Sequence, residues 1–204
     1  MLNTIIEGFQ KDGAVFMWAI LMFGGLAVAL AAERAYYIYI KCSSGRASFM
    51  TNIARLLQAG KYEEAGKHAA SKTFPLAGVI SAVLNNKGRE ENVVDKAVDE
   101  VYLTEAPRIN RYLNLLMTVA NLATLAGLLG TVYGLIVSFD AVANLPAAER
   151  PKALADGIAV AMGTTFFGLT VAIPTIFIHG LLTSQSERLV EELEEKAVKV
   201  MNLL

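Results

Sequence analysis

The sequence predicts an all-α integral membrane protein with three transmembrane helices and a helical cytoplasmic domain. Hydrophobic residues make up 54% of the chain and charged residues only 18%, whereas a soluble domain carries about a quarter charged residues. Three stretches contain no Asp, Glu, Lys or Arg, namely residues 14–32, 113–139 and 157–186. Each is close to or above the roughly 20 apolar residues that a helix needs to cross a bilayer. No segment shows the alternation of apolar and polar residues that indicates a half-buried strand.

The first apolar stretch admits two interpretations. Ala29 and Ala31 resemble the small residues of a signal-peptide cleavage site, but acidic Glu7 and Asp12 precede the stretch, and it is long for the apolar core of a signal peptide. We therefore interpret it as a membrane span. The second and third stretches exceed the length that is needed, so we expect them to tilt or to extend as helices beyond the bilayer. We place the three spans at residues 14–40, 113–139 and 157–183.

Basic residues beside the spans predict the orientation. They follow the first span and precede the second, at Lys41, Arg46, Arg55, Arg108 and Arg111. The segment between the second and third spans has fewer basic residues, and acidic residues accompany them. Because cytoplasmic segments carry the excess of Lys and Arg, residues 41–112 and the C-terminal helix 184–204 are predicted to be cytoplasmic. Residues 1–13 and 140–156 are then periplasmic.

The cytoplasmic domain is predicted to consist of helices. Apolar residues at helical spacing and the turn residues between them indicate helices near residues 49–57, 63–70 and 76–84. A fourth helix begins at Glu90 and continues to Leu116 at the second span, with Pro107 able to kink it. The C-terminal helix has one apolar stripe, which this fourth helix or a neighbouring copy would cover. The stripe consists of Leu189, Leu193, Ala197, Val200 and Leu204.

Composition argues against several classes of function. The net charge of −1 gives no indication of a nucleic-acid partner. A single cysteine, Cys42, excludes an intrachain disulfide and a cysteine-rich metal site. The spans contain no nucleophile–base pair and no H-E-x-x-H motif, so we expect neither an enzyme nor a cofactor.

Polar and small residues inside the second and third spans are the candidate functional residues. In the second span, Thr124, Thr131 and Ser138 are spaced by seven residues and share one helix face. Threonine hydroxyls in membrane helices either bond to a carbonyl one turn earlier or line a polar strip that faces a pore or a partner helix, and spacing alone leaves both interpretations open. Small residues favour close helix packing. The remaining candidates are Thr164 and Thr165 for the pore, and Gly127, Gly130, Gly134 and Gly168 for packing.

Two long motifs resemble those of a known family. Residues 125–136, LAGLLGTVYGLI, are similar to the G-L-L-G-T-V-x-G signature of the MotA/TolQ/ExbB proton-channel family. Residues 154–174, LADGIAVAMGTTFFGLTVAIP, are similar to the G-I-A-x-A-L-x-T-T-x-x-G-L-x-V-A-I-P pattern of its third span. The three-span layout resembles the ExbB and TolQ branch more than the four-span flagellar stators.

This resemblance implies a motor subunit in the bacterial inner membrane. Members of the family form a homo-oligomeric ring, typically a pentamer, around two single-span partners of the ExbD or TolR type, each with one membrane aspartate. By the same resemblance, Thr131 and Thr165 face the pore. One position departs from the pattern, because Val160 stands where ExbB-like members often carry glutamate. The sequence chooses neither between proton and sodium nor among the possible tasks, and a non-conducting three-span scaffold remains the rival interpretation.

Overall fold

The computed structural model describes residues 9, 14–43, 45–143 and 145–203. Of the segment predicted as a periplasmic N-terminus, residues 1–13, all but Phe9 lie outside this description. Every regular element among the described residues is a helix. Three of these helices are long and apolar enough to cross a membrane. The all-α, three-span fold class predicted from the sequence is therefore confirmed.

The chain divides into two units. Residues 1–32 and 112–180 form the first, which we call the span unit because it contains the first two apolar stretches and most of the third. Residues 33–111 and 181–204 form the second, which we call the charged unit.

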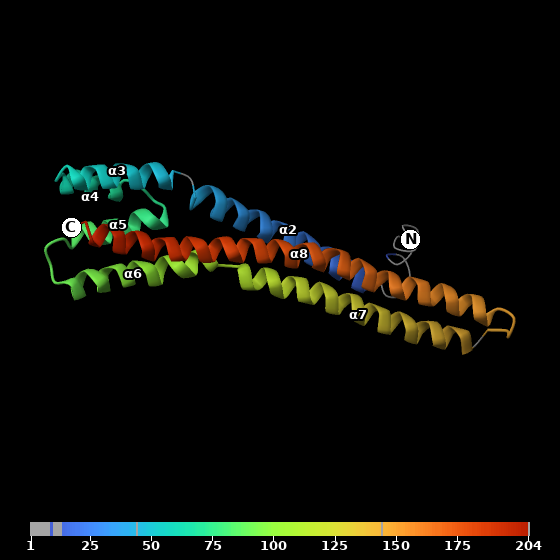
Figure 1. Ribbon diagram of the computed structural model, residues 1–204. Coiled ribbons are helices and arrows are strands. Elements are labelled where there is room, and N and C mark those ends of the chain that lie inside the picture. The colour runs from blue at the N-terminus through green and yellow to red at the C-terminus, as the bar shows by residue number, and fades with distance from the viewer. Residues whose placement is uncertain (1–8, 10–13, 44, 144, 204) are drawn as a thin grey trace. The chain divides into compact units, whose positions relative to one another are not determined.

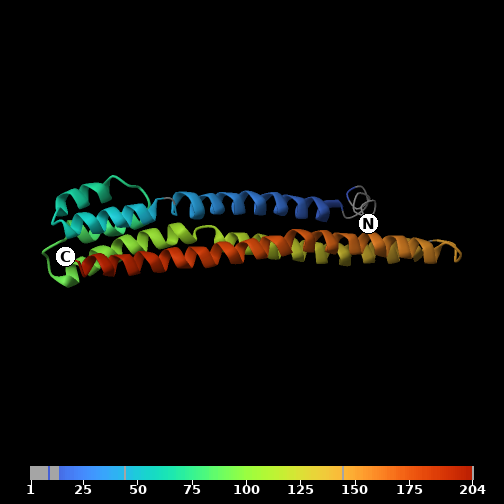
Figure 2. The same ribbon diagram turned by 45° about the horizontal axis from the view of Figure 1, so that its top comes forward.

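The span unit contains α2 (Ala14–Ala35) up to residue 32, α7 (Leu113–Ala143), and α8 (Arg150–Met201) up to residue 180. The short connection between α7 and α8 makes them antiparallel neighbours, and both views show the two helices side by side in this unit (Figures 1 and 2). Pro174 lies inside α8 without ending it. Because proline has no N–H, the carbonyl of Thr170 loses its helical donor there.

The charged unit is built mainly from short helices. A π-helical turn, Tyr36–Lys41, follows α2. The sequence analysis placed the next three helices to within a few residues of their bounds. Gly60 (φ 72°) lies in the turn after the first of them and Gly88 (φ 81°) in the turn after the third, and both adopt left-handed backbone conformations that favour glycine. Pro75 occupies the first position of its helix, where its missing N–H costs nothing. The helices are α3 (Arg46–Gln58), α4 (Tyr62–Ala70), α5 (Pro75–Asn85) and α6 (Glu91–Asn110).

The apolar stripe at the C-terminal end of α8 belongs to the core of the charged unit. Its members Leu189, Leu193, Ala197 and Val200 are each at most 4% exposed, whereas Leu204 lies outside the described residues. This end of α8 runs beside α6 in both views (Figures 1 and 2). Of the two covers predicted for the stripe, the structure therefore supplies the one from the same chain.

The fourth helix does not continue to Leu116 as expected. It includes Pro107 but ends at Asn110. Arg111 is extended (ψ 137°), Tyr112 has φ 66°, and α7 begins at Leu113. Pro107 only removes one N–H donor from the helix. The interruption lies four and five residues later, where the backbone of Arg111 and Tyr112 leaves the helical region.

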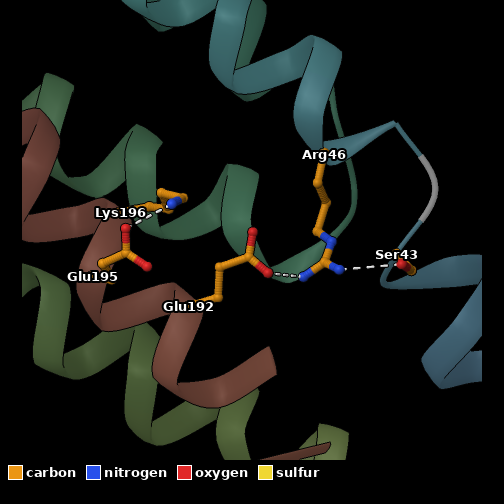
Figure 3. A network of polar contacts seen from close by, with 5 residues as sticks. All are labelled: Ser43, Arg46, Glu192, Glu195 and Lys196. Atoms are coloured by element: carbon orange, nitrogen blue, oxygen red, sulfur yellow. Dashed lines mark hydrogen bonds and ion pairs between the residues drawn. The ribbon is translucent and has the colours of Figure 1, made fainter. Parts of the chain in front are cut away.

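An ion pair connects the beginning of α3 to α8 within the charged unit (Figure 3). The Arg46 guanidinium donates to the Glu192 carboxylate and, at 3.1 Å, to the Ser43 hydroxyl. The two charged side chains are 17% and 30% exposed, and the Nε atom of Arg46 is buried without a hydrogen-bond partner. The neighbouring Glu195–Lys196 pair is more open, since the Glu195 side chain is 65% exposed.

We predict that Glu192→Gln loosens the beginning of α3. The substitution leaves the partly buried Arg46 charge without its carboxylate, at a cost of about 1–2 kcal/mol. Hydrogen exchange of the first α3 amides should then accelerate by about 5- to 30-fold. Glu195→Gln is the matched control, and an equal acceleration in both variants would contradict the role given to the Arg46 pair.

Candidate functional site

The backbones of α7 and α8 approach each other closely at two glycines. A Cβ atom on Gly168 would lie 2.7 Å from the Ala123 carbonyl oxygen and 3.2 Å from the Gly127 Cα. A Cβ atom on Gly127 would lie 3.0 Å from the Thr164 carbonyl oxygen. Nearly all real Cβ contacts are longer than these distances, so a side chain at either position would push the helices apart. The glycines thus bring backbone carbonyls of one helix within reach of side chains on the other.

Further small residues continue this contact. A Cβ on Gly134 would lie 2.8 Å from the Ala161 Cβ, and one on Gly130 would lie 2.9 Å from the Thr164 hydroxyl oxygen and 3.1 Å from the Phe16 Cβ of α2. Gly157, which the sequence analysis did not single out, is equally constrained, because a Cβ there would lie 2.0 Å from the Ser138 Oγ. Its position at the start of the third charge-free stretch was the signal that could have identified it.

The close approach assembles a cluster of three threonine hydroxyls, from Thr131 on α7 and from Thr164 and Thr165 on α8. The Thr131 hydroxyl contacts that of Thr165 directly and lies 3.3 Å from that of Thr164. It also lies 2.9 Å from the Ala161 carbonyl oxygen. We call these three residues the threonine cluster.

Two backbone carbonyl oxygens accept hydrogen bonds from the threonine cluster. The Gly127 carbonyl lies 3.0 to 3.2 Å from all three hydroxyl oxygens, and the Ala161 carbonyl also lies 2.7 Å from the Thr164 hydroxyl. Each hydroxyl has one proton to donate and can accept as well. Either partner can be the donor in the contacts between hydroxyls. The cluster can therefore present a donor or an acceptor to an approaching group by rotating hydroxyls, without carrying a fixed charge.

The three hydroxyls differ in exposure. Thr164 is only 4% exposed and is enclosed between the two helices. Thr131 and Thr165 are half-buried. These two are the members that can meet a group outside this chain.

Thr124 and Ser138 lie apart from the cluster, although they share a face of α7 with Thr131. Thr124 donates to the Ala120 carbonyl at 3.2 Å, and Ser138 donates to the Gly134 carbonyl at 2.6 Å. Both bonds stay within α7, one turn earlier. Ser138 is 8% exposed and lies against Gly157, so its surroundings are those of a helix contact.

Acidic side chains are absent from the stretches around the cluster. The sequences 113–139 and 157–186 contain no Asp or Glu, and Val160 is a half-buried neighbour of Ala161. Among the described residues, no group of three or more His, Cys, Asp or Glu side chains could hold a metal ion. The site, as described, offers neutral hydroxyls and carbonyls.

Comparison with known proteins decides the family. The model of the MotA/TolQ/ExbB proton channel family matches residues 67–195, which is more than half of the chain and includes the whole threonine cluster. The chain belongs to this family. Its relatives carry ExbB and TolQ names, which supports the ExbB/TolQ-like branch.

Relatives of this ExbB/TolQ-like chain come from distant organisms. The biopolymer transport protein exbB1 of Vibrio cholerae is 29% identical over 93% of this chain and 84% of its own length. A putative ExbB homologue of Methanothermobacter thermautotrophicus is 27% identical over 94% of this chain and 67% of its own. The Tol-Pal system protein TolQ of Pseudomonas aeruginosa is 32% identical over 48% of this chain and 42% of its own.

We predict that Gly168→Ala destabilises this ExbB/TolQ-like chain. The added methyl group would collide with the Ala123 carbonyl and force α7 from α8, at a cost of about 1–3 kcal/mol. The melting temperature in mild detergent, followed by circular dichroism, should fall by about 2–10 °C.

Gly163→Ala is the matched control on the same helix, because no atom lies within 4 Å of a Cβ built there. It should leave the melting temperature unchanged or raise it, since alanine favours helix over glycine. Equal losses in the two variants would contradict the close approach at Gly168.

Proposed function

We propose that this chain is the ring-forming subunit of an ion-driven motor in the bacterial inner membrane. In this proposal several copies, five by resemblance to the family, surround two copies of an ExbD/TolR-like single-span protein that carries a membrane aspartate. Ion flow protonates and releases that aspartate, and the cycle turns the ring relative to the partner pair. Membership of the proton channel family rests on the family match.

The observation that carries the proposal is the pair of half-buried hydroxyls of Thr131 and Thr165. A carboxylate in the middle of a bilayer costs several kcal/mol unless polar groups meet it. These hydroxyls can donate to a charged aspartate or accept from a protonated one. Each hydroxyl also lies within hydrogen-bond distance of a backbone carbonyl of this chain, so it keeps a partner when the aspartate moves away.

Because the cluster contains no acidic residue, two proteins contribute to the proposed ion pathway. With Val160 at the family's frequent glutamate position, this chain supplies hydroxyls and the partner supplies the titrating carboxylate. The subunit alone should then conduct poorly. Each proton that crosses 100 mV releases about 2.3 kcal/mol, so several protons in each cycle could drive mechanical work of that order.

The proposed arrangement in the membrane follows the basic residues of the sequence. Residues 41–112 and 184–204 are cytoplasmic in this proposal, and residues 1–13 and 140–156 are periplasmic. The names of the relatives support an envelope task, since one is a biopolymer transport protein and another belongs to the Tol-Pal system.

A non-conducting scaffold is the rival function, and one observation favours it. Thr131, Thr164 and Thr165 all find acceptors within this chain, as helix-packing threonines would. The two functions differ in what happens when hydroxyls are removed without a change of shape. A scaffold, which conducts nothing, would still hold its partners, whereas a motor would lose ion-driven work.

We predict that the double variant Thr131→Val with Thr165→Val abolishes ion-driven work. Valine keeps the shape but leaves the partner aspartate without hydroxyl partners, at about 1–3 kcal/mol for each lost contact. Proton uptake into liposomes that contain this chain and its single-span partner, measured with a pH-sensitive dye under an imposed potential, should fall by about tenfold or more.

Two controls accompany this experiment. Thr124→Val removes a hydroxyl that bonds only within α7 and should leave uptake unchanged. Thr131→Ser with Thr165→Ser keeps both hydroxyls and should retain most of the uptake. Normal uptake by the double valine variant, with the assembly intact, would contradict the role given to the two hydroxyls. Absence of uptake by the unsubstituted assembly would favour the scaffold.

A further inference from the structure

Polar side chains from two other segments of the charged unit form hydrogen bonds with the last turn of α6. Arg34, in the last turn of α2, donates from Nη1 to the Arg108 carbonyl at 3.1 Å. Ser186, on α8, donates to the Asn110 side-chain oxygen at 2.6 Å. The last four carbonyls of a helix have no donor within that helix. Arg34 therefore supplies a bond that α6 cannot make for itself.

Both donors are buried. Arg34 is 3% exposed and Ser186 is fully buried. The Arg34 guanidinium also bonds to the carboxylate of Glu33 and lies 4.8 Å from the centre of the Tyr37 ring. A cation is favourable at a helix C-terminus because the free carbonyls carry partial negative charge. These contacts hold the guanidinium at the end of α6.

The backbone that follows α6 adopts a disfavoured conformation. Tyr112 has φ 66°, the left-handed region that residues with a Cβ rarely occupy. In an uninterrupted helix, the Arg108 carbonyl would accept the N–H of Tyr112. Instead it accepts the Arg34 guanidinium, and the Tyr112 carbonyl accepts the first helical bond of α7, from Leu116 N–H at 2.9 Å. Such a conformation persists only where the surroundings hold it.

We propose that Arg34 and Ser186 are positioning residues that keep α6 ended at Asn110 and Tyr112 in its left-handed conformation. Neither Arg34 nor Ser186 is part of the threonine cluster, so both act through the backbone.

The first test is hydrogen exchange of the last-turn amides of α6 in the full-length protein. Arg34→Met keeps the length of the side chain but removes its donors, and Glu33 is not stranded because its side chain is 49% exposed. Exchange at residues 108–110 should accelerate about fivefold or more, the effect of losing one stabilising contact. Ser186→Ala should act in the same direction, and Ser184→Ala, an exposed serine on the same helix, should not.

The second test is rescue at Tyr112. Glycine adopts the left-handed conformation without strain, so Tyr112→Gly should remove most of the acceleration caused by Arg34→Met. Tyr112→Ala removes the same ring but keeps the strain, so it should give no rescue. If Arg34 serves only to fill space, its substitution will accelerate exchange equally in all three backgrounds, which would overturn the proposal.

Hydrogen exchange at the end of α6 is measured without any ion-driven activity. A rescued exchange pattern in a chain that never takes up protons would therefore support the positioning role and contradict only the motor. Should Arg34→Met fail to fold, the milder Ser186→Ala carries the same comparison with Tyr112→Gly and Tyr112→Ala.

Discussion

The close approach of α7 and α8 at Gly127 and Gly168 is the constraint on which the candidate site depends. With the Gly127 Cα only 3.2 Å from the position that a Cβ on Gly168 would occupy, the carbonyl of Gly127 comes within bonding distance of hydroxyls on the facing helix. The threonine cluster is a consequence of this geometry. It places exchangeable protons inside an apolar unit without a fixed charge, at a place where a buried charge would be costly.

Much of the fold follows from simple sequence patterns because single residues determine it locally. Charge-free stretches long enough to cross a bilayer became the apolar helices, and Gly60 and Gly88 lie in the turns that separate helices of the charged unit. The interruption before α7 was not predictable in the same way. Pro107 indicated a disturbance in that region, but the backbone departs from the helix at Arg111 and Tyr112, which carry no local turn signal. The bonds from Arg34 to the Arg108 carbonyl and from Ser186 to the Asn110 side chain lie just before this point and join residues far apart in the sequence.

The candidate site was predictable as a set of residue types but not as an arrangement. Spacing by seven residues puts Thr124, Thr131 and Ser138 on one face of α7, yet only Thr131 meets hydroxyls of α8. At the depth of Ser138 the neighbouring helix presents Gly157, which has no side chain to bond. Helical periodicity also could not tell that Thr164 is enclosed while Thr165 remains accessible, because that depends on which face the neighbouring helix covers.

In the proposed motor, several copies of this chain surround a partner that brings the titrating carboxylate. The decisive measurement is native mass spectrometry of the chain purified in mild detergent after co-expression with its genomic neighbours. We expect one dominant assembly with five copies of this chain and two copies of a small single-span protein. A monomer or dimer that retains no single-span companion would contradict it and favour the scaffold.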